Sequence, residues 1–580
     1  MLQNRWRQPG INRTAQTHLS TLPRSSAALA IASAQARTLL ATAGVVIFSV
    51  IWFALALGRP LAQPDEGRYA EIPREMVALD DWVTPHLNHL AYLEKPPLQY
   101  WVTALAYKLF GVGEWTARLW TMLSGWLNVV LVFLLGRRLW GLRTGVLAAV
   151  LLASTVLHFA MGQILTLDMS FTFLMTAMLC AFCMAQATRD SALRESRRWI
   201  LASWLILGLA VLTKGLVAVV IAAAVLSIYV LWQRDWAVLR TMRPVAGLVV
   251  LITVTAPWFI QVSRENPDFL QFFFIREHFQ RYLTDAARRV EPWWYFLAVF
   301  AAGVLPWLPQ MAAALWHGWR SGAPRGQLDL RRLFWIWCVF VVAFFSLSSS
   351  KLAPYVLPVL PPLALLTASR EKCLDPRALR VSIGLLVLFA VALPVYGLVV
   401  EFSSKDSRVL AVVNEAWPTI LVFDLIALTA AMLCWRATQR GRSLQAIVGI
   451  AAAWFLGLSV LLATAGRHDS LRSGRSLAAQ IPADLAAHAP IFSVQTYDQT
   501  LPFYLQKTMF LVDWRGELDY GLRYAPGRTI TDMARFEETW RDLVNGIAVM
   551  SHETYAQLDA RGLPMRVLGR DKRRVAVSRQ

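Results

Sequence analysis

Long apolar stretches separated by short polar loops fill the chain between residues 39 and 464. Most of these stretches approach the ~20 residues that an α-helix needs to cross ~30 Å of hydrocarbon. The pattern predicts thirteen transmembrane helices, at 39–58, 117–136, 143–162, 169–187, 199–213, 215–232, 245–262, 293–312, 332–349, 353–369, 380–400, 418–435 and 445–464. We therefore expect a polytopic α-helical membrane protein with an N-terminal tail over residues 1–38.

A fourteenth apolar stretch, 97–111, is short for a crossing, because it would span only about 22 Å as a helix. Loops rich in Lys and Arg mark the cytoplasmic side of a membrane protein. If 97–111 does not cross, the basic tail and all the short basic loops fall on one side of the membrane. The sequence thus predicts an interfacial or re-entrant helix at 97–111, a cytoplasmic tail and an external C-terminus.

Three long segments then lie on the external side: 58–116, 263–292 and 465–580. In the third segment, short apolar runs alternate with helical patterns, which predicts a small soluble α/β domain. The expected strands are 491–494, 509–512, 547–550, 566–568 and 574–577, and the expected helices are 471–488, 533–544 and 551–561. The chain is accordingly divided into the tail, a transmembrane domain over 39–464 and this C-terminal domain over 465–580.

Composition supports the membrane interpretation. Of 580 residues, 56% are hydrophobic and 16% are charged, whereas soluble proteins carry about a quarter charged residues. The formal net charge is +20. A nucleic-acid partner is not expected, because the basic residues are spread over seven cytoplasmic segments rather than gathered on one domain. Cys180 and Cys183 have CxxC spacing, but their apolar neighbours favour buried thiols over a metal site.

Ionisable residues gather in the first external loop. Asp65, Glu66 and Arg68 follow the first predicted helix directly, and Lys95 stands before the rigid pair Pro96-Pro97. Further charged and polar residues stand where other helices turn on the same side: Asp168, Lys214, Arg281, Lys351 and Tyr355. Charged groups at a membrane boundary are costly unless they are paired or face water. We expect them to converge on one external cavity, with structural ion pairs as the alternative.

Four of these cations, Arg68, Lys95, Arg281 and Lys351, together with the Tyr355 hydroxyl, would suit a phosphate group. Phosphate-binding cations beside carboxylates at a lipid boundary favour group transfer from a lipid phosphate, and a lipid or ion transporter is the alternative. Glu94 and His278 could share a divalent metal such as zinc. No cofactor is required by the pattern.

These residues carry a resemblance to a known family. The runs Asp65-Glu66-x-Arg68-Tyr69-Ala70-Glu71, Glu94-Lys95-Pro96, Thr213-Lys214-Gly215, Glu277-His278-x-Gln280-Arg281 and Lys351-Leu352-x-x-Tyr355 resemble the 4-amino-4-deoxy-L-arabinose lipid A transferases. These belong to the C-type glycosyltransferase superfamily, as do the protein O-mannosyltransferases. The resemblance implies thirteen crossings, a periplasmic α/β domain and a sugar donor linked to polyprenyl phosphate.

By the same resemblance, Asp65 corresponds to the catalytic aspartate, and Lys95, Arg281 and Tyr355 to positions around the donor phosphate. We take Asp65 and Asp168 as candidate catalytic residues. The candidate substrate-binding residues are Glu66, Arg68, Lys95, Lys214, Arg281, Lys351 and Tyr355, and the candidate metal ligands are Glu94 and His278.

The function implied is inverting transfer of aminoarabinose from undecaprenyl phosphate to a lipid A phosphate in the bacterial inner membrane, with the active site facing the periplasm. Such a transfer would change outer-membrane charge and confer polymyxin resistance. The alternatives are another transferase that uses polyprenyl phosphate sugars, such as a protein O-mannosyltransferase, and a transporter of lipid-linked sugars. Membrane lipids are expected partners in each case.

Overall fold

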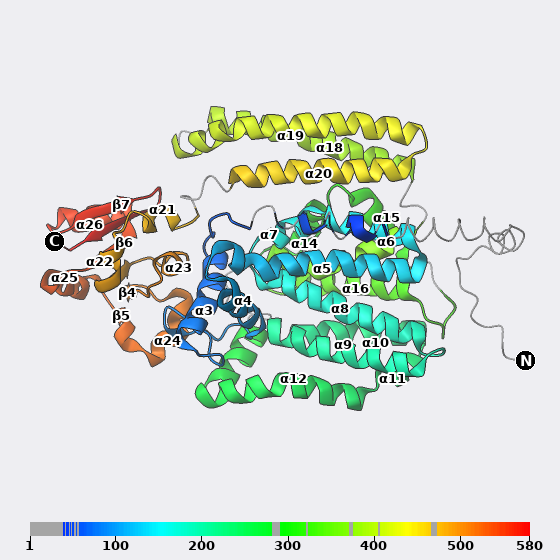
Figure 1. Cartoon of the computed structure of the whole chain (residues 1–580), viewed down its shortest axis with the longest axis horizontal. Coiled ribbons are helices and arrows are strands. Elements are labelled where there is room, and N and C mark those ends of the chain that lie inside the picture. Colours follow the sequence, from blue (N-terminus) through cyan, green and yellow to red (C-terminus); the bar gives the residue numbers. More distant parts are fainter. Residues whose placement is uncertain are drawn as a thin grey trace, which may run out of the picture.

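A computed structural model describes residues 39–579 apart from 41, 46, 48, 52–53, 55–56, 281–290, 321–322, 371–374, 404–406 and 466–471. A bundle of helices makes up one end of the molecule and a small α/β domain the other (Figure 1). Between them lie two helices of the first external loop, α3 (Asp65–Leu79) and α4 (Leu98–Phe110).

The bundle contains a helix in every apolar stretch that the sequence pattern marks. A short helix, Thr42–Ile51, comes first. The others are α5 (Glu114–Trp140), α6 (Leu142–Ala153), α7 (Val156–Gln163), α8 (Leu167–Thr188), α9 (Leu193–Lys214), α10 (Val217–Gln233), α11 (Ala237–Met242), α12 (Pro244–Glu265), the π-helix η1 (Gln271–Gln280), α14 (Tyr295–Gly303), α15 (Leu308–Gly318), α16 (Leu330–Leu347), the 3-10 helix η3 (Ala353–Val359), α17 (Leu360–Ala368), α18 (Pro376–Ser403), α19 (Ser407–Gln439) and α20 (Ser443–Ala465).

Among the described residues, eight helices are long and apolar enough to span a membrane, and the bent pair α6–α7, which turns by 65°, makes a ninth. The remaining segments of the thirteen are shorter or interrupted. The 293–312 segment, for example, is divided into α14 and α15 around Pro306, a residue that lacks the amide donor a continuous helix uses. The multi-pass architecture is therefore confirmed, and the number thirteen stays a prediction.

The short stretch 97–111 forms α4, a helix of 13 residues. At 1.5 Å per residue it is about 20 Å long, too short for the hydrocarbon layer. The helix packs on α3, where the Tyr107 hydroxyl donates to the Ala70 carbonyl at 3.1 Å. A hairpin of β1 (His86–Leu87) and β2 (Leu90–Ala91) connects the two helices. The first external loop is thus a compact structure of its own.

The C-terminal domain has a six-stranded sheet in the order β5-β4-β3-β6-β8-β7. All five predicted strands are present, as β3 (Ile491–Val494), β4 (Phe510–Val512), β6 (Ile547–Ser551), β7 (Arg566–Arg570) and β8 (Arg574–Ser578). The sixth strand, β5 (Thr529–Ile530), has only two residues and was not predicted. The helices are α21 (Arg475–Ala478), α22 (Ala483–His488), α23 (Leu501–Leu505), η6 (Gly516–Leu518), α24 (Asp519–Tyr524), η7 (Pro526–Arg528), α25 (Met533–Asp542) and α26 (His552–Ala560).

One predicted helix of this domain is wrong in extent. The 471–488 pattern gives two short helices, α21 and α22, instead of one long helix. Pro482 stands immediately before α22, where a proline is tolerated, whereas inside a continuous helix it would remove a hydrogen bond. In the bundle, Cys180 and Cys183 are free and buried, as predicted.

A separate hydrophobic core joins the first loop to the C-terminal domain. Tyr69, Tyr92 and Tyr100 of the loop pack in it with Tyr497 and Phe503 of the domain. The start of α8 contributes Leu165 and Leu167. This core therefore joins the first loop, the bundle and the C-terminal domain.

Candidate active site

Asp65 begins α3 and lies at the surface between the bundle and the C-terminal domain. Its carboxylate is 52% exposed and accepts a hydrogen bond from Arg68 Nη1 at 2.9 Å, one helical turn along. The Arg68 guanidinium is largely buried, lies over the Tyr92 ring and forms a second ion pair with Glu517 of the C-terminal domain. A carboxylate that remains accessible beside a fixed cation is suited to contact a substrate.

Glu66, the neighbour of Asp65, is placed differently. Its side chain is 1% exposed, and it accepts hydrogen bonds from Arg59, Arg118 and the amides of Ala62 and Leu165. Burial alone would raise the pKa of Glu66, but Arg118 and Arg59 outweigh it and lower the pKa to about 2. The Glu66 oxygens therefore hold the first loop against α5 and the segment that leads into α8, and the expectation that Glu66 also binds substrate stays a prediction.

Asp168, Lys214 and Tyr355 come together from three parts of the bundle. Lys214 at the end of α9 donates to Asp168 in the first turn of α8. Its ammonium also lies 4.6 Å from the centre of the Tyr355 ring in η3. These three residues are therefore in contact, as the sequence pattern predicts.

Lys95 lies between the two large external loops. Its ammonium is 3.6 Å from Glu277 in η1 and donates to the Glu94 carbonyl at 2.9 Å. Lys351, between α16 and η3, is 7% exposed, and among the described residues it forms no ion pair. A shielded ammonium in this position is suited to form charge-assisted hydrogen bonds with an anion.

Three buried tyrosines connect these groups. Burial is the main cause that raises the pKa of Tyr69 well above its usual value. The charges of Asp65 and Asp168 raise this pKa further. Burial likewise raises the pKa of Tyr92 and Tyr100. The charges of Arg68, Glu94 and Glu517 also act on both hydroxyl groups. The Tyr100 hydroxyl is buried without a hydrogen-bond partner in the described part of the chain. Asp65, Arg68, Glu94 and Asp168 thus surround one group of buried tyrosines.

Two candidates cannot be placed. Arg281 lies outside the described residues, and of His278 only the backbone, in η1, is described. Within the described part of the chain, no three His, Cys, Asp or Glu residues gather as a metal site would require. Glu94 and His278 alone fall short of the three protein ligands of a catalytic zinc ion, so we derive no step through a metal.

The sequence did not single out several residues that complete this region: Arg59, Arg118, Glu277 and Glu517. Glu277 and Arg59 stand in or beside the motifs, which could have indicated them. Arg118 and Glu517 lie in segments without a motif.

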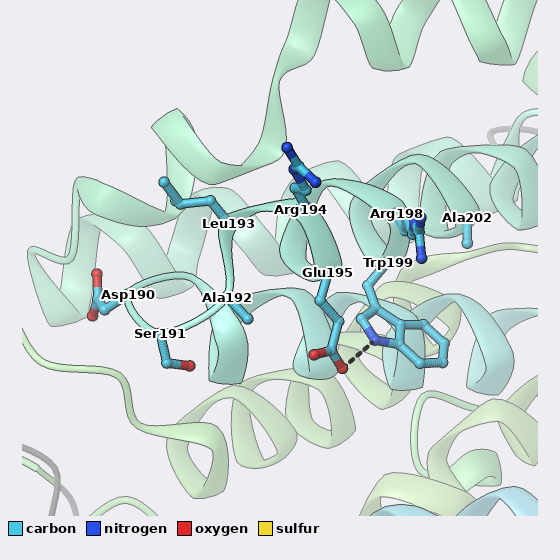
Figure 2. A pocket seen from close by; sticks show the side chains of 9 residues that line it. All are labelled: Asp190, Ser191, Ala192, Leu193, Arg194, Glu195, Arg198, Trp199 and Ala202. Atoms are coloured by element: carbon cyan, nitrogen blue, oxygen red, sulfur yellow. Dashed lines mark hydrogen bonds between the residues drawn. The ribbon is translucent and has the colours of Figure 1, made fainter.

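A hollow of about 940 Å³ lies at the junction of α8 and α9, lined by Asp190, Arg194, Glu195, Arg198 and Trp199 among others (Figure 2). Trp199 Nε1 donates to Glu195, one turn earlier in α9, at 3.3 Å. This junction is at the end of the bundle away from α3 and α4 (Figure 1). It belongs to a basic loop predicted to be cytoplasmic and is not part of the charged region around Asp65.

Known proteins match both parts of the chain. The sequence model of the dolichyl-phosphate-mannose-protein mannosyltransferases matches residues 37–273, and that of the aminoarabinose transferase C-terminal domain matches residues 477–579. The undecaprenyl phosphate-α-4-amino-4-deoxy-L-arabinose arabinosyl transferase of Erwinia tasmaniensis is 34% identical over 514 residues, which are 83% of this chain and 88% of the relative. Its counterpart in Edwardsiella ictaluri is 32% identical over 83% of this chain and 87% of its own length.

The chain belongs to this arabinosyl transferase family.

Solved structures of the family agree. ArnT from Cupriavidus metallidurans bound to undecaprenyl phosphate is 35% identical, with a TM-score of 0.84 over 93% of this chain and 98% of that one. The apo state of the same protein has a TM-score of 0.83 at 34% identity, over 94% of this chain and 98% of that one. Membership in the arabinosyl transferases confirms the predicted family, the C-type glycosyltransferase fold with its C-terminal domain, and the enzyme class.

Proposed function

We propose that this arabinosyl transferase moves 4-amino-4-deoxy-L-arabinose from undecaprenyl phosphate to a phosphate group of lipid A. The observation that carries the proposal is the gathering of Asp65, Arg68, Lys95, Asp168 and Lys214 around one tyrosine-lined region in a chain of this family. The named relatives act on an undecaprenyl phosphate sugar, and one related structure holds undecaprenyl phosphate.

The donor phosphate has candidate partners on two sides of the region. Lys351 is 7% exposed between α16 and η3, and Lys95, whose ammonium is 3.6 Å from Glu277, lies between the two large external loops. These two ammonium groups contact the phosphate, together with Arg281 and the Tyr355 hydroxyl. These cations would stabilise the charge that develops on the leaving undecaprenyl phosphate.

The reaction forms a bond between an acceptor phosphate oxygen and the anomeric carbon, while the bond from that carbon to the undecaprenyl phosphate oxygen breaks with inversion. A lipid A phosphate is already ionised near neutral pH, because its second pKa is about 6. It needs no general base. Asp65 then orients the acceptor or stabilises positive charge on the sugar, and the Lys214–Asp168 pair holds the wall formed by α8 and α9.

The location follows from the charge pattern. The junction of α8 and α9, which is lined by Arg194 and Arg198, lies at the end of the bundle opposite α3 and α4 (Figure 1), and basic loops mark the cytoplasmic side. The region around Asp65 would then face the periplasm from the inner membrane. Adding an amino sugar to a lipid A phosphate supplies a positive charge, which weakens the binding of cationic peptides such as polymyxin.

The test is the lipid A of a polymyxin-sensitive bacterial strain that makes the donor but lacks its own transferase. Expression of this chain should add aminoarabinose to lipid A, detected by mass spectrometry, and should raise polymyxin resistance. Asp65→Asn at equal expression serves as the control and should leave lipid A unmodified. Unmodified lipid A with the wild-type chain, or a sugar on protein instead, would reject this function.

A further inference from the structure

One short segment of the C-terminal domain contacts both large external loops. The segment consists of η6 and α24, residues 516–524. Glu517 in η6 is ion-paired with Arg68 of the first loop. In α24, the Tyr520 ring lies 4.4 Å from that of Phe272, and the Tyr524 hydroxyl donates to Asp268. Asp268 and Phe272 precede the part of η1 that holds Glu277, the partner of Lys95.

The C-terminal domain also approaches α3 closely beside Asp65. A Cβ atom on Gly67 would lie 2.5 Å from the carbonyl carbon of Gln499 and 2.6 Å from the Thr500 amide nitrogen. The two backbones are thus in direct contact two residues from the catalytic candidate Asp65. Such a contact leaves little freedom for Arg68, which follows Gly67, to move relative to the domain.

Arg68 divides its guanidinium between two carboxylates. Nη1 donates to Asp65 at 2.9 Å, while Nη2 faces Glu517. Glu517 is itself held, because its other oxygen accepts from Gln499 Nε2 at 2.8 Å. Gln499 is the residue whose backbone contacts Gly67. The chain of contacts runs from the sheet domain through Glu517 and Arg68 to Asp65.

We infer that Glu517 is a positioning residue for sugar transfer, so that the C-terminal domain is a working part of the active site. The inference rests on the proposed function. An arginine readily forms two parallel hydrogen bonds with one carboxylate. With Glu517 in place, Nη2 is engaged and one Asp65 oxygen stays available to the substrate. Without Glu517, Arg68 turns both nitrogens to Asp65 and withdraws it from the reaction.

The test uses the purified full-length enzyme with undecaprenyl phosphate aminoarabinose and lipid A, comparing Glu517→Gln with Glu517→Asp and wild type. Glu517→Gln should lower kcat about 10-fold or more, since small errors in placing a catalytic group cost this much, with the KM for the donor within about 2-fold. Glu517→Asp, which keeps the charge, should recover part of kcat. Glu537→Gln is the matched control, because Glu537 forms ion pairs with Arg541 and Arg561 inside the domain and is 13% exposed against 15% for Glu517.

A double-mutant cycle separates positioning from simple docking. If Glu517 acts through Arg68, the Arg68→Gln, Glu517→Gln double variant should be no slower than Arg68→Gln alone. Additive losses would overturn the inference, as would wild-type kcat in Glu517→Gln or an equal loss in Glu537→Gln. If Glu517→Gln does not fold, the cycle is run with Glu517→Asp. A wild-type enzyme that transfers no aminoarabinose rejects the proposed function itself, a result distinct from all of these.

Discussion

Arg118 holds the carboxylate of Glu66 with two hydrogen bonds of 2.9 Å, from Nε to Oε1 and from Nη2 to Oε2. Each side chain is only 1% exposed. The same arginine donates to the carbonyls of Leu57, Arg59 and Pro60, so it orders the chain that leads into α3. The position of Asp65, next to Glu66, therefore depends on this buried ion pair.

Replacing Glu66 by Gln should destabilise the protein strongly. Two arginines would then keep buried charges with no carboxylate between them, and breaking a buried ion pair from one side costs about 3–5 kcal/mol. The melting temperature in detergent measures the effect. Glu195→Gln, at the basic end of the bundle, is the control and should melt like wild type, because the one hydrogen bond of Glu195 within the described part of the chain, to Trp199, is 3.3 Å long. Equal melting of Glu66→Gln and wild type would contradict this role.

A pH dependence of stability is expected from Glu75 in α3. Burial and the neighbouring Glu71 raise the pKa of Glu75 from its ordinary 4.5 to about 8. Between these values the folded protein binds a proton that the unfolded chain has lost. The contribution of Glu75 is therefore fully present below pH 4.5 and declines as the pH rises through 8. The Glu75 oxygens accept hydrogen bonds from the Asn88 and His89 amides, and the Asn88 side chain is hydrogen-bonded to the backbone of Met509 in the C-terminal domain. We therefore expect the contact between the first external loop and the C-terminal domain to loosen as the pH rises.

The measurement is the melting temperature of wild type and Glu75→Gln between pH 5 and 8.5. The variant should be less stable at pH 5, because it lacks one acceptor for two amides, an effect of about 1–3 kcal/mol. Its stability should nevertheless fall less steeply with rising pH than that of wild type. Parallel curves for the two proteins would show that Glu75 does not titrate in this range.

The sequence was informative where a pattern is long and regular. Apolar stretches located the helices of the bundle and all but the two-residue strand of the sheet. Motif residues and helix ends also indicated that Asp168, Lys214 and Tyr355 meet. Pairings such as Arg68 with Glu517 could not be predicted, because they join segments far apart in the chain and neither spacing nor composition shows which acid faces which base. The burial of Glu66 was missed for the same reason.

Asp65→Asn should lower transfer about 100-fold or more, as expected when a group that stabilises transition-state charge is removed. The asparagine oxygen can still accept from Arg68, so folding and undecaprenyl phosphate binding should be kept. Transfer in detergent with purified enzyme measures the change. Asp80→Asn, at the exposed end of the same helix, is the matched control and should remain active. Full activity of Asp65→Asn would remove Asp65 from the mechanism.

Neutralising Lys214 alone should destabilise the protein more than neutralising both Lys214 and Asp168. Lys214→Gln leaves the shielded Asp168 without its cation, whereas Asp168→Asn with Lys214→Gln leaves two neutral groups that can still form a hydrogen bond. The double variant should therefore regain melting temperature relative to Lys214→Gln. If Asp168 also takes part in transfer, the double variant should stay inactive. A double variant less stable than both single variants would contradict the pairing.

Gly67→Ala tests how tightly the C-terminal domain must dock beside Asp65. Inside a helix, alanine is normally about 1 kcal/mol more favourable than glycine. At Gly67 the added methyl group would lie 2.5 Å from the Gln499 backbone, which cannot rotate away. We therefore expect a lower melting temperature, faster proteolysis between the bundle and the domain, and reduced transfer. Gly384→Ala in α18, where nothing lies within 4 Å, is the matched control and should be neutral or stabilising. If Gly67→Ala behaved like Gly384→Ala, α3 and the domain could separate without affecting catalysis.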